Sequence, residues 1–223
     1  MILPISEIVI EAKKRGIKTI IDGAHVPAHI ELDIKELDPD YYTGALHKWL
    51  CCPKGISFLY VKKEHQEGIQ PMVKSWGWGE EYEKFKSSTQ LHSPSRFINV
   101  FQWQGTMDMS AFFTVPDAIQ FQNEHDWNNV RSRCFDMVIE ARNRINDITK
   151  LPKICPDSWL GHMATILFPI DDTSSFKKTL YNDYQIEMPV MSHKDHTAFR
   201  ISIQGYNSDA DIDYLINSLE ELI

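Results

Sequence analysis

The fold of this chain is decided by the stretch from Ile20 to Val61, IIDGAHVPAHIELDIKELDPDYYTGALHKWLCCPKGISFLYV. Three short apolar runs lie in or beside it: Ile17–Ile21, a run that ends at Tyr41–Gly44, and Ile56–Val61. Short apolar runs joined by longer segments predict parallel strands with crossover connections. In open α/β sheets, ligands bind beyond the carboxyl ends of the strands. Asp22 and Lys48 follow the first two runs, so we expect both side chains to face one crevice.

A carboxylate and an amine in one crevice suggest pyridoxal phosphate chemistry. The lysine forms a Schiff base with the cofactor aldehyde, and the aspartate pairs with the pyridinium nitrogen and keeps it protonated. The plainer alternative is a surface lysine together with an aspartate that caps a turn at the end of a strand. The spacing of Asp22 and Lys48 alone leaves both interpretations open.

The residues around these two positions resemble the class V aminotransferase family of fold type I pyridoxal-phosphate enzymes. Within that family the likeness is greatest to the isopenicillin N epimerase-like branch. The segments that carry it are Asp22-Gly23-Ala24-His25, Asp40–Gly44, His47–Leu50, Pro53-Lys54-Gly55, Gln104–Asp108, Phe199–Ser202 and Tyr206-Asn207. These segments span essentially the whole chain. Their combination is specific, whereas any single segment would be a weak signal.

The resemblance implies a role for each matching residue. Lys48 would form the Schiff base and transfer protons, and His25 would lie beside the phenolic oxygen or the reacting carbon of the cofactor. Epimerisation by two bases needs a second proton donor on the far face, for which His25 is a candidate, unless the donor lies in a missing N-terminal half. The cofactor contacts implied are Asp22, His25, Thr43, His47, Lys48, Gly105 and Thr106. Arg200 would bind the substrate α-carboxylate, since an arginine fork binds a carboxylate through two hydrogen bonds. The resemblance also implies a homodimer in which Gly105-Thr106 contacts the cofactor phosphate of the neighbouring subunit.

Several of these residues also have plainer interpretations. Lys54 is a rival for the Schiff base, but it lies between Pro53 and Gly55 in a turn, which favours Lys48. Thr106 would serve equally as an ordinary helix N-cap. Arg200 would serve equally as a solvent-facing arginine on a strand. Thr43 and His47 flank the proposed turn, so they would either contact the phosphate or order Lys48.

No metal site is expected from the sequence. His25 and His29 are four residues apart, a spacing that suits a metal on a helix, but Pro27 breaks such a helix and no third ligand is apparent. The four cysteines, two of them adjacent, make neither a disulfide framework nor a CxxC pair. We therefore expect a reducing, cytoplasmic environment.

The matching residues are compatible with three functions. The first is epimerisation or transamination at the α-carbon of an amino acid, and the second is C–S lysis without a cysteine. The third is an inactive fragment that folds and dimerises without turnover. Cysteine desulfuration would need a nucleophilic cysteine shortly before the carboxylate-binding arginine, and Met188–Phe199 contains none.

The composition excludes other classes of partner. The chain has 223 residues, 43% of them hydrophobic and 24% charged, with a formal net charge of −8. A negative charge argues against a nucleic-acid partner, because phosphate binding needs a concentrated basic surface. No apolar run approaches the roughly 18 residues of a membrane helix, so we expect no membrane partner.

The expected fold class is α/β. Residues 1–115 would form the C-terminal part of a pyridoxal-phosphate-binding large domain with a mostly parallel sheet, and 116–223 a small C-terminal α+β domain. Family members carry a further stretch of comparable length before this one, so we expect a missing N-terminal half that supplies most of the phosphate loop. The helices expected are Ser6–Arg15, Lys62–Gln70, a long helix from Asp126, Thr173–Tyr181 and Ser208–Ile223, and Asp33–Leu37 is expected to be a short helix or a turn. The further strands expected are Asn99–Gln104, Met163–Phe168, Gln185–Val190 and Phe199–Ile203, and an aromatic loop, Ser75–Gly79, precedes a long connection, Glu80–Arg96.

Overall fold

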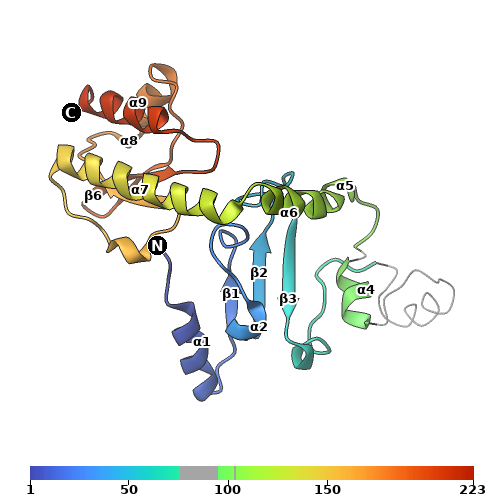
Figure 1. Cartoon of the computed structure of the whole chain (residues 1–223). Helices are drawn as coiled ribbons and strands as arrows, with labels where there is room; N and C mark the ends of the chain where they lie inside the picture. The colour runs from blue at the N-terminus through green and yellow to red at the C-terminus, as the bar shows by residue number, and fades with distance from the viewer. Residues whose placement is uncertain (76–94, 103) are drawn as a thin grey trace. The chain divides into compact units, whose positions relative to one another are not determined.

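The computed structural model describes residues 1–75, 95–102 and 104–223 (Figure 1). The chain forms two compact units, one from Ser6–Ile119 and one from Met1–Ile5 together with Gln120–Ile223. The predicted aromatic loop and the long connection after it fall almost entirely outside the described residues. None of the helices that the structure describes combines the length and apolarity needed to cross a membrane.

The Ser6–Ile119 unit contains a sheet of three strands, β1 (Ile20–Asp22), β2 (Tyr41–Ala45) and β3 (Ser57–Val61), in that spatial order (Figure 1). β1 and β2 are parallel, as predicted, whereas β3 runs antiparallel to β2. The prediction of a parallel third strand was therefore wrong. Only residues 46–56 connect β2 to β3, and a parallel crossover needs about a dozen residues or more, usually including a helix.

Helix α1 (Ile5–Lys14) precedes the sheet and ends before Gly16, which has a φ of 66°. Glycine takes this left-handed conformation readily, and it ends the helix expected over Ser6–Arg15. β1 begins at Ile20, three residues later than expected, and the Ile20 side chain is 79% exposed. β1 is an edge strand of the described sheet, because only β2 is paired with it. Its outer side is therefore unpaired among the described residues.

Asp40 joins the amino ends of β1 and β2 to the segment that follows β3. Its carboxylate accepts hydrogen bonds from Thr19 N at 2.8 Å and from His65 Nε2 at 2.7 Å. Burial alone would oppose ionisation, but these hydrogen bonds hold the pKa of Asp40 below its usual value. The charged carboxylate therefore links three segments at the end of the sheet away from Asp22.

The short helix α2 (Ile34–Leu37) was predicted, and its cap explains it. Asp33 accepts hydrogen bonds from the backbone N–H groups of Lys35 and Glu36, and Asp38 ends the helix with a φ of 48°. The predicted surface helix Lys62–Gln70 is only a 3₁₀ turn, η1 (Lys63–His65).

Residues 99–102 are helical, so the predicted strand Asn99–Gln104 was wrong. They belong to α4 (Arg96–Gln102), in which the rings of Phe97 and Phe101 lie 4.9 Å apart. Aromatic residues four apart meet on one face of a helix, so the apolar pattern here is helical rather than alternating. Two further helices follow, α5 (Ser110–Phe113) and α6 (Val115–Glu124).

The second unit has an antiparallel sheet in the order β4-β6-β5, made of β4 (Met163–Leu167), β6 (His196–Ser202) and β5 (Val190–His193). Its helices are α7 (Trp127–Thr149), α8 (Thr173–Asn182) and α9 (Asp209–Glu220), with a 3₁₀ turn, η2 (Asp157–Trp159). The first residues of the chain belong here, since Ile2 N donates to Trp159 O at 2.7 Å. The predicted β-α-β-β-α order is confirmed.

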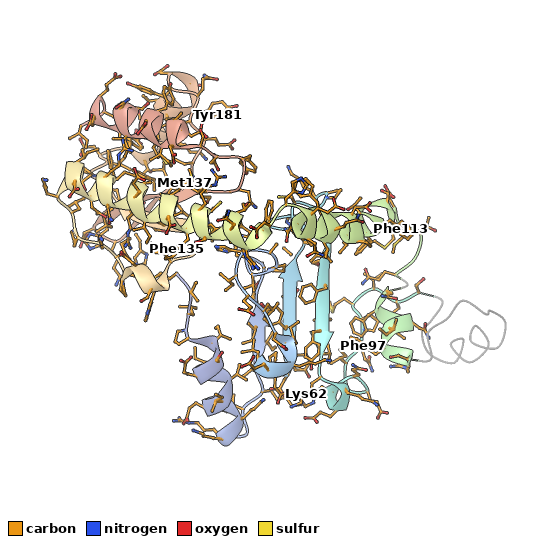
Figure 2. All side chains as sticks on the ribbon, viewed as in Figure 1. Lys62, Phe97, Phe113, Phe135, Met137 and Tyr181 are labelled. Atoms are coloured by element: carbon orange, nitrogen blue, oxygen red, sulfur yellow. The ribbon has the colours of Figure 1, made fainter. Side chains whose placement is uncertain are left out.

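One apolar core holds this second unit together, and Met137 of α7 lies in it (Figure 2). An apolar stripe on α7, the long helix expected from Asp126, supplies Cys134, Val138, Ala141 and Ile145 to the same core. The predicted strand Gln185–Val190 was largely wrong, because β5 begins only at Val190. Gln185 has a φ of 55°, and its side-chain amide donates to the last carbonyls of α8. This residue closes a helix and does not open a strand.

Candidate functional site

Lys48 lies in a turn that the backbone closes tightly after β2. Leu46 N donates to Ile56 O, and Cys52 N donates to Leu46 O, both at 3.1 Å. Within this loop Cys51 N donates to Lys48 O at 3.2 Å. The side chains of Cys52 and Ile56 are buried beneath it. The half-buried lysine is therefore held on a defined turn three residues beyond the end of β2.

Asp22 is the last residue of β1, and Gly23 lets it approach β2. Gly23 N donates to Thr43 O at 2.8 Å. A Cβ atom at position 23 would lie 1.9 Å from the hydroxyl oxygen of Tyr42, so only glycine fits here. Burial, with the negative charge of Asp22, raises the pKa of Tyr42 to about 12. Tyr42 therefore stays neutral beside the carboxylate.

The carboxylate of Asp22 is only partly used by the protein. One oxygen, Oδ1, accepts a hydrogen bond from Ala24 N at 3.0 Å. The other oxygen has no hydrogen-bond partner among the described residues. Asp22 is exposed, so this second oxygen is available to a donor from outside the chain.

His25 links the loop after β1 to the turn after β2. Its Nε2 lies 3.1 Å from Nζ of Lys48, and its Nδ1 accepts a hydrogen bond from Nε1 of Trp49 at 3.2 Å. The carboxyl ends of two parallel strands thus bring together an imidazole and an amine that are far apart in sequence. Sequence reasoning missed Trp49, which is buried next to Lys48, so its indole N–H needs an acceptor.

His29 supports this arrangement from behind. Its ring stacks on Trp49 with centroids 4.3 Å apart, and its Nδ1 lies 2.8 Å from His25 O. Burial lowers the pKa of His29 to about 4, so the ring is neutral near pH 7. A neutral ring with its proton on Nδ1 donates to the carbonyl of His25. His29 thus has a structural role beside the site.

Thr43 and His47 are bound to the β2–β3 backbone. Thr43 Oγ1 donates to Phe58 O at 3.0 Å, and Nδ1 of His47 lies 3.2 Å from Ile56 O. A hydroxyl has only one proton to donate, so Thr43 has none left for a phosphate oxygen. Of the two roles considered for these residues, the contacts favour ordering the Lys48 turn.

Gly105 and Thr106 do not open a helix, contrary to prediction. They lie in a bend where Gly105 has a φ of 108°, and α5 starts only at Ser110. Asp108 accepts a hydrogen bond from Ser110 N at 2.8 Å just before that helix, whose N-cap is Met109, so Thr106 is not the N-cap considered for it. A phosphate contact in a neighbouring subunit stays a prediction for these two residues.

Arg200 lies in β6 opposite Thr165 of β4, in the unit that does not contain Lys48. Its neighbours Phe199 and Ile201 are buried, as the predicted alternation requires. The Nε atom of Arg200 is buried and has no hydrogen-bond partner among the described residues. An unsatisfied buried donor is costly, and a bound carboxylate would satisfy it.

Within the described residues, one group of side chains has ligand atoms close enough for a metal: Asp40, Glu64 and His65. It lies at the opposite end of β2 from the Lys48 turn, and Asp40 already accepts hydrogen bonds there from Thr19 and His65. The candidate site itself therefore contains a carboxylate, an amine and an imidazole, without a cluster of metal ligands.

Comparisons with known proteins agree on one family. The family model described as Aminotransferase class-V matches residues 1–215. The chain is 31% identical over 230 residues to an isopenicillin N epimerase from Streptomyces clavuligerus, covering 100% of the chain and 57% of that protein. It is 29% identical over 225 residues to an isopenicillin N epimerase from Amycolatopsis lactamdurans, covering 100% of the chain and 56% of that protein. The chain thus spans little more than half the length of these curated relatives.

A solved structure shows the same fold. The apo structure of a cysteine desulfurase from Thermococcus onnurineus NA1 matches with a TM-score of 0.80 at 19% identity, covering 99% of this chain and 56% of that one. The predicted fold, part of a pyridoxal-phosphate transferase large domain followed by a small α+β domain, is confirmed.

Proposed function

The chain belongs to the class V aminotransferase family, and we propose that the complete protein acts at the α-carbon of an amino acid with pyridoxal phosphate as its cofactor. Proteins of this family are pyridoxal-phosphate dependent. Epimerisation is the reaction that the names of the two curated relatives indicate, and transamination is close to it in mechanism.

One observation supports this proposal most strongly: the carboxyl ends of β1 and β2 present an available carboxylate oxygen on Asp22 and the amine of Lys48. These are the two groups that the cofactor requires. An acidic residue accepts a hydrogen bond from its ring nitrogen, and a lysine amine bonds to its aldehyde carbon. The donor set of the site therefore fits the cofactor.

When bound, pyridoxal phosphate supplies a protonated ring that withdraws electrons from the bonds of the substrate α-carbon. Asp22 keeps the proton on the ring nitrogen through a charge-assisted hydrogen bond. Lys48 would take up the α-proton on its Nζ atom, and His25, whose Nε2 lies 3.1 Å from Nζ, would orient that amine. We assign Arg200 to the substrate carboxylate, because its buried Nε has a donor to offer.

Two outcomes follow from where the proton is returned. Inversion of the amino acid would need a second proton donor on the face of the α-carbon opposite Lys48, for which His25 is the candidate that this chain offers. Transamination would instead need Lys48 to carry the proton away from the α-carbon, and the amino group would stay with the cofactor as the keto acid leaves. Cleavage of a C–S bond is the second candidate function, since it also begins with removal of the α-proton. The absence of cysteine from Met188–Phe199 favours these reactions over a desulfurase with a cysteine nucleophile.

We further infer that this chain does not carry the whole site. Its curated relatives are nearly twice as long, and Thr43 has no hydroxyl proton left for a phosphate. A further segment, from the same gene or a separate chain, would supply the remaining phosphate donors.

The test is proton exchange in heavy water. The complete protein is incubated with pyridoxal phosphate and a panel of amino acids, and loss of the α-proton signal is followed by NMR. Exchange with inversion indicates an epimerase, a keto acid indicates an aminotransferase, and release of sulfide from a cysteine-type substrate indicates a lyase. No exchange with any amino acid would refute the proposal and favour an inactive chain that only folds and dimerises.

A further inference from the structure

Arg200 is an arginine that the protein leaves without a partner. Its half-buried guanidinium makes no hydrogen bond or ion pair within the part of the chain that the structure describes, and its Nε atom is buried. The four arginines of α7, in the same unit, each donate to an acceptor: Arg131 to Asn128, Arg133 to Gly205 O, Arg142 to Asp157 and Arg144 to Asp213. A guanidinium without a counter-charge is open to an anion from outside the chain.

Thr165 of β4 lies on the same face of the sheet as Arg200. The two residues are directly opposite each other in the antiparallel register of β4 and β6. Their neighbours along the two strands all belong to the apolar core of this unit: Ala164, Ile166, Phe199 and Ile201. Because side chains alternate along a strand, Thr165 and Arg200 both point to the face of the sheet away from that core.

The backbone hydrogen bonds of β6 show how close this pair is. Arg200 N donates to Pro189 O at 3.0 Å, on the β5 side, whereas Ile203 N donates to His162 O at 2.9 Å, on the β4 side. Arg200 and Thr165 therefore exchange no backbone hydrogen bonds with each other. In such a pair the Cα atoms are only about 4.5 Å apart and the side chains come closer than in a hydrogen-bonded pair. The Thr165 hydroxyl thus lies next to the stem of the arginine.

The hydroxyl of Thr165 is unused by the protein. Thr165 is half-buried, and its Oγ1 has no hydrogen-bond partner among the described residues. Another threonine of the same sheet, Thr197, shows the opposite case. Its Oγ1 donates to Phe168 O at 2.6 Å and accepts from Ile170 N at 3.1 Å. The Thr197 hydroxyl is therefore structural, whereas the Thr165 hydroxyl has a proton to donate to a ligand.

We propose that Thr165 is a second ligand of the substrate α-carboxylate, beside Arg200. The identity of the ligand rests on the proposed function, in which Arg200 binds that carboxylate. The guanidinium donates two hydrogen bonds to the two oxygens, and the hydroxyl donates a third to one of them from the neighbouring strand. A third donor on a different strand holds the carboxylate in one orientation, and with it the α-carbon to which the carboxylate is bonded.

The first measurement is urea denaturation of the chain without cofactor. Thr165→Val keeps the shape of the side chain and removes the hydroxyl, and it should leave the folding equilibrium constant unchanged. Thr197→Val is the matched variant, and it should lower that constant tenfold or more because it loses two hydrogen bonds. An equal loss of stability in the two variants would overturn the inference, since the Thr165 hydroxyl would then be structural.

The second measurement tests the carboxylate site on the same chain, with acetate as the probe and chloride at equal concentration as the control. A ligand that binds only the folded chain raises the unfolding free energy. We expect acetate to raise it more than chloride does in the wild type, and to raise it less in Thr165→Val and in Arg200→Lys. The same increase in all three proteins, or no increase in any of them, would overturn the inference whether or not the complete protein binds an amino acid.

The third measurement is amino-acid affinity in the complete protein with pyridoxal phosphate. Thr165→Val should lower the affinity roughly tenfold, because it loses a hydrogen bond to a charged group, whereas Thr165→Ser and the control Thr197→Val should keep it. If both residues bind one carboxylate, Thr165→Val combined with Arg200→Lys should lose less affinity than the product of the two single losses. Wild-type affinity in Thr165→Val would overturn the inference. An absence of amino-acid binding in the wild type would refute the proposed function and leave the acetate result standing.

Discussion

Asp22 lies directly opposite Thr43 in the register of the parallel strands β1 and β2. This register places Asp22 at the same end of the sheet as the turn that carries Lys48. Lys48 lies five residues beyond Thr43. Because both strands run in one direction, the loops that follow them meet, and His25 reaches Lys48 at 3.1 Å. Slipping the register by one residue would move each of these side chains to the other face of the sheet.

Cofactor attachment should depend on Lys48 alone among the lysines near the turn. With the complete protein, borohydride should fix pyridoxal phosphate on Lys48, and Lys48→Ala should be colourless. Lys54→Ala is the matched control and should stay coloured, since Lys54 is exposed beside Gly55 in the same loop. Peptide mapping that places the cofactor on Lys54 or Lys62 would contradict the assignment.

Gly23→Ala should destabilise the Ser6–Ile119 unit. The added Cβ would lie 1.9 Å from the hydroxyl oxygen of Tyr42, a ring that is only 2% exposed and has little room to move. Overpacking of this kind costs about 1–3 kcal/mol. Urea denaturation measures the change in unfolding free energy. Gly68→Ala is the control, because its Cβ would meet nothing closer than 3.8 Å, and equal stability of the two variants would refute the close approach.

The unfolding free energy should decrease as the pH is lowered, partly because of His29. Its pKa is about 4 in the folded chain, against 6.5 for a solvated histidine, so the unfolded chain binds more protons between these values. Its contribution is therefore fully present above about pH 6.5 and is lost as pH falls through about 4. His29→Phe, which cannot ionise, should show a smaller loss of unfolding free energy between pH 7 and pH 4.5.

The control for that experiment is His193→Phe, which changes an exposed histidine of β5. Its pH profile should follow that of the wild type. If His29→Phe and the wild type lose the same free energy over this range, the burial of a neutral His29 is not a determinant of acid stability.

Arg200→Lys should weaken binding of the amino acid and leave the absorbance of the bound cofactor unchanged. A lysine cannot reproduce the two-pronged contact of a guanidinium with a carboxylate. A charge-assisted pair is worth about 1.5–3 kcal/mol, so the affinity should fall roughly tenfold or more. Substrate titration measures it, with Arg144→Lys, which pairs with Asp213 on the surface, as a control. Equal affinity in Arg200→Lys and the wild type would show that Arg200 does not bind the substrate carboxylate.

The 223-residue chain by itself should associate, as a homodimer that covers β1, and should hold the cofactor weakly. Ile20 is 79% exposed on this edge strand, and unpaired edges favour pairing with another chain. Light scattering after size exclusion measures the association, and Ile20→Lys should reduce it. A segment equivalent to the rest of the relatives, fused or added in trans, should restore tight binding. A monomer that binds the cofactor tightly and turns over an amino acid would contradict this expectation.

The sequence predicted the elements whose signals are local. The helix expected over Ser6–Arg15, the short element at Asp33–Leu37 and the long helix from Asp126 each depend on residues within a few turns of one another. The predicted direction of β3 was wrong, because the direction depends on the length of the 46–56 connection and not on the strand itself. The prediction of a strand from Asn99 was wrong. Phe97 and Phe101 are four residues apart and so lie on one face of a helix, but over so short a segment this spacing resembles the alternation of a strand.

The site was predicted in its residues but not in its contacts. Asp22, His25 and Lys48 follow from their order along the two strands, since parallel strands end together. The hydrogen bond from Trp49 to His25 and the use of the Thr43 hydroxyl by Phe58 O could not be read from spacing. Both depend on side-chain directions that only the folded turn determines.

The carboxylate of Asp40 has a consequence for how this fold can diversify. It joins Thr19, the start of β2 and His65 at the end of the sheet away from the site, so strand order is secured there. Substitutions in the turns after β1 and β2 can then change the chemistry without changing the topology. The contacts that secure topology and the turns that determine the chemistry thus lie at opposite ends of the same three strands, which suits a scaffold that supports several reactions on one cofactor.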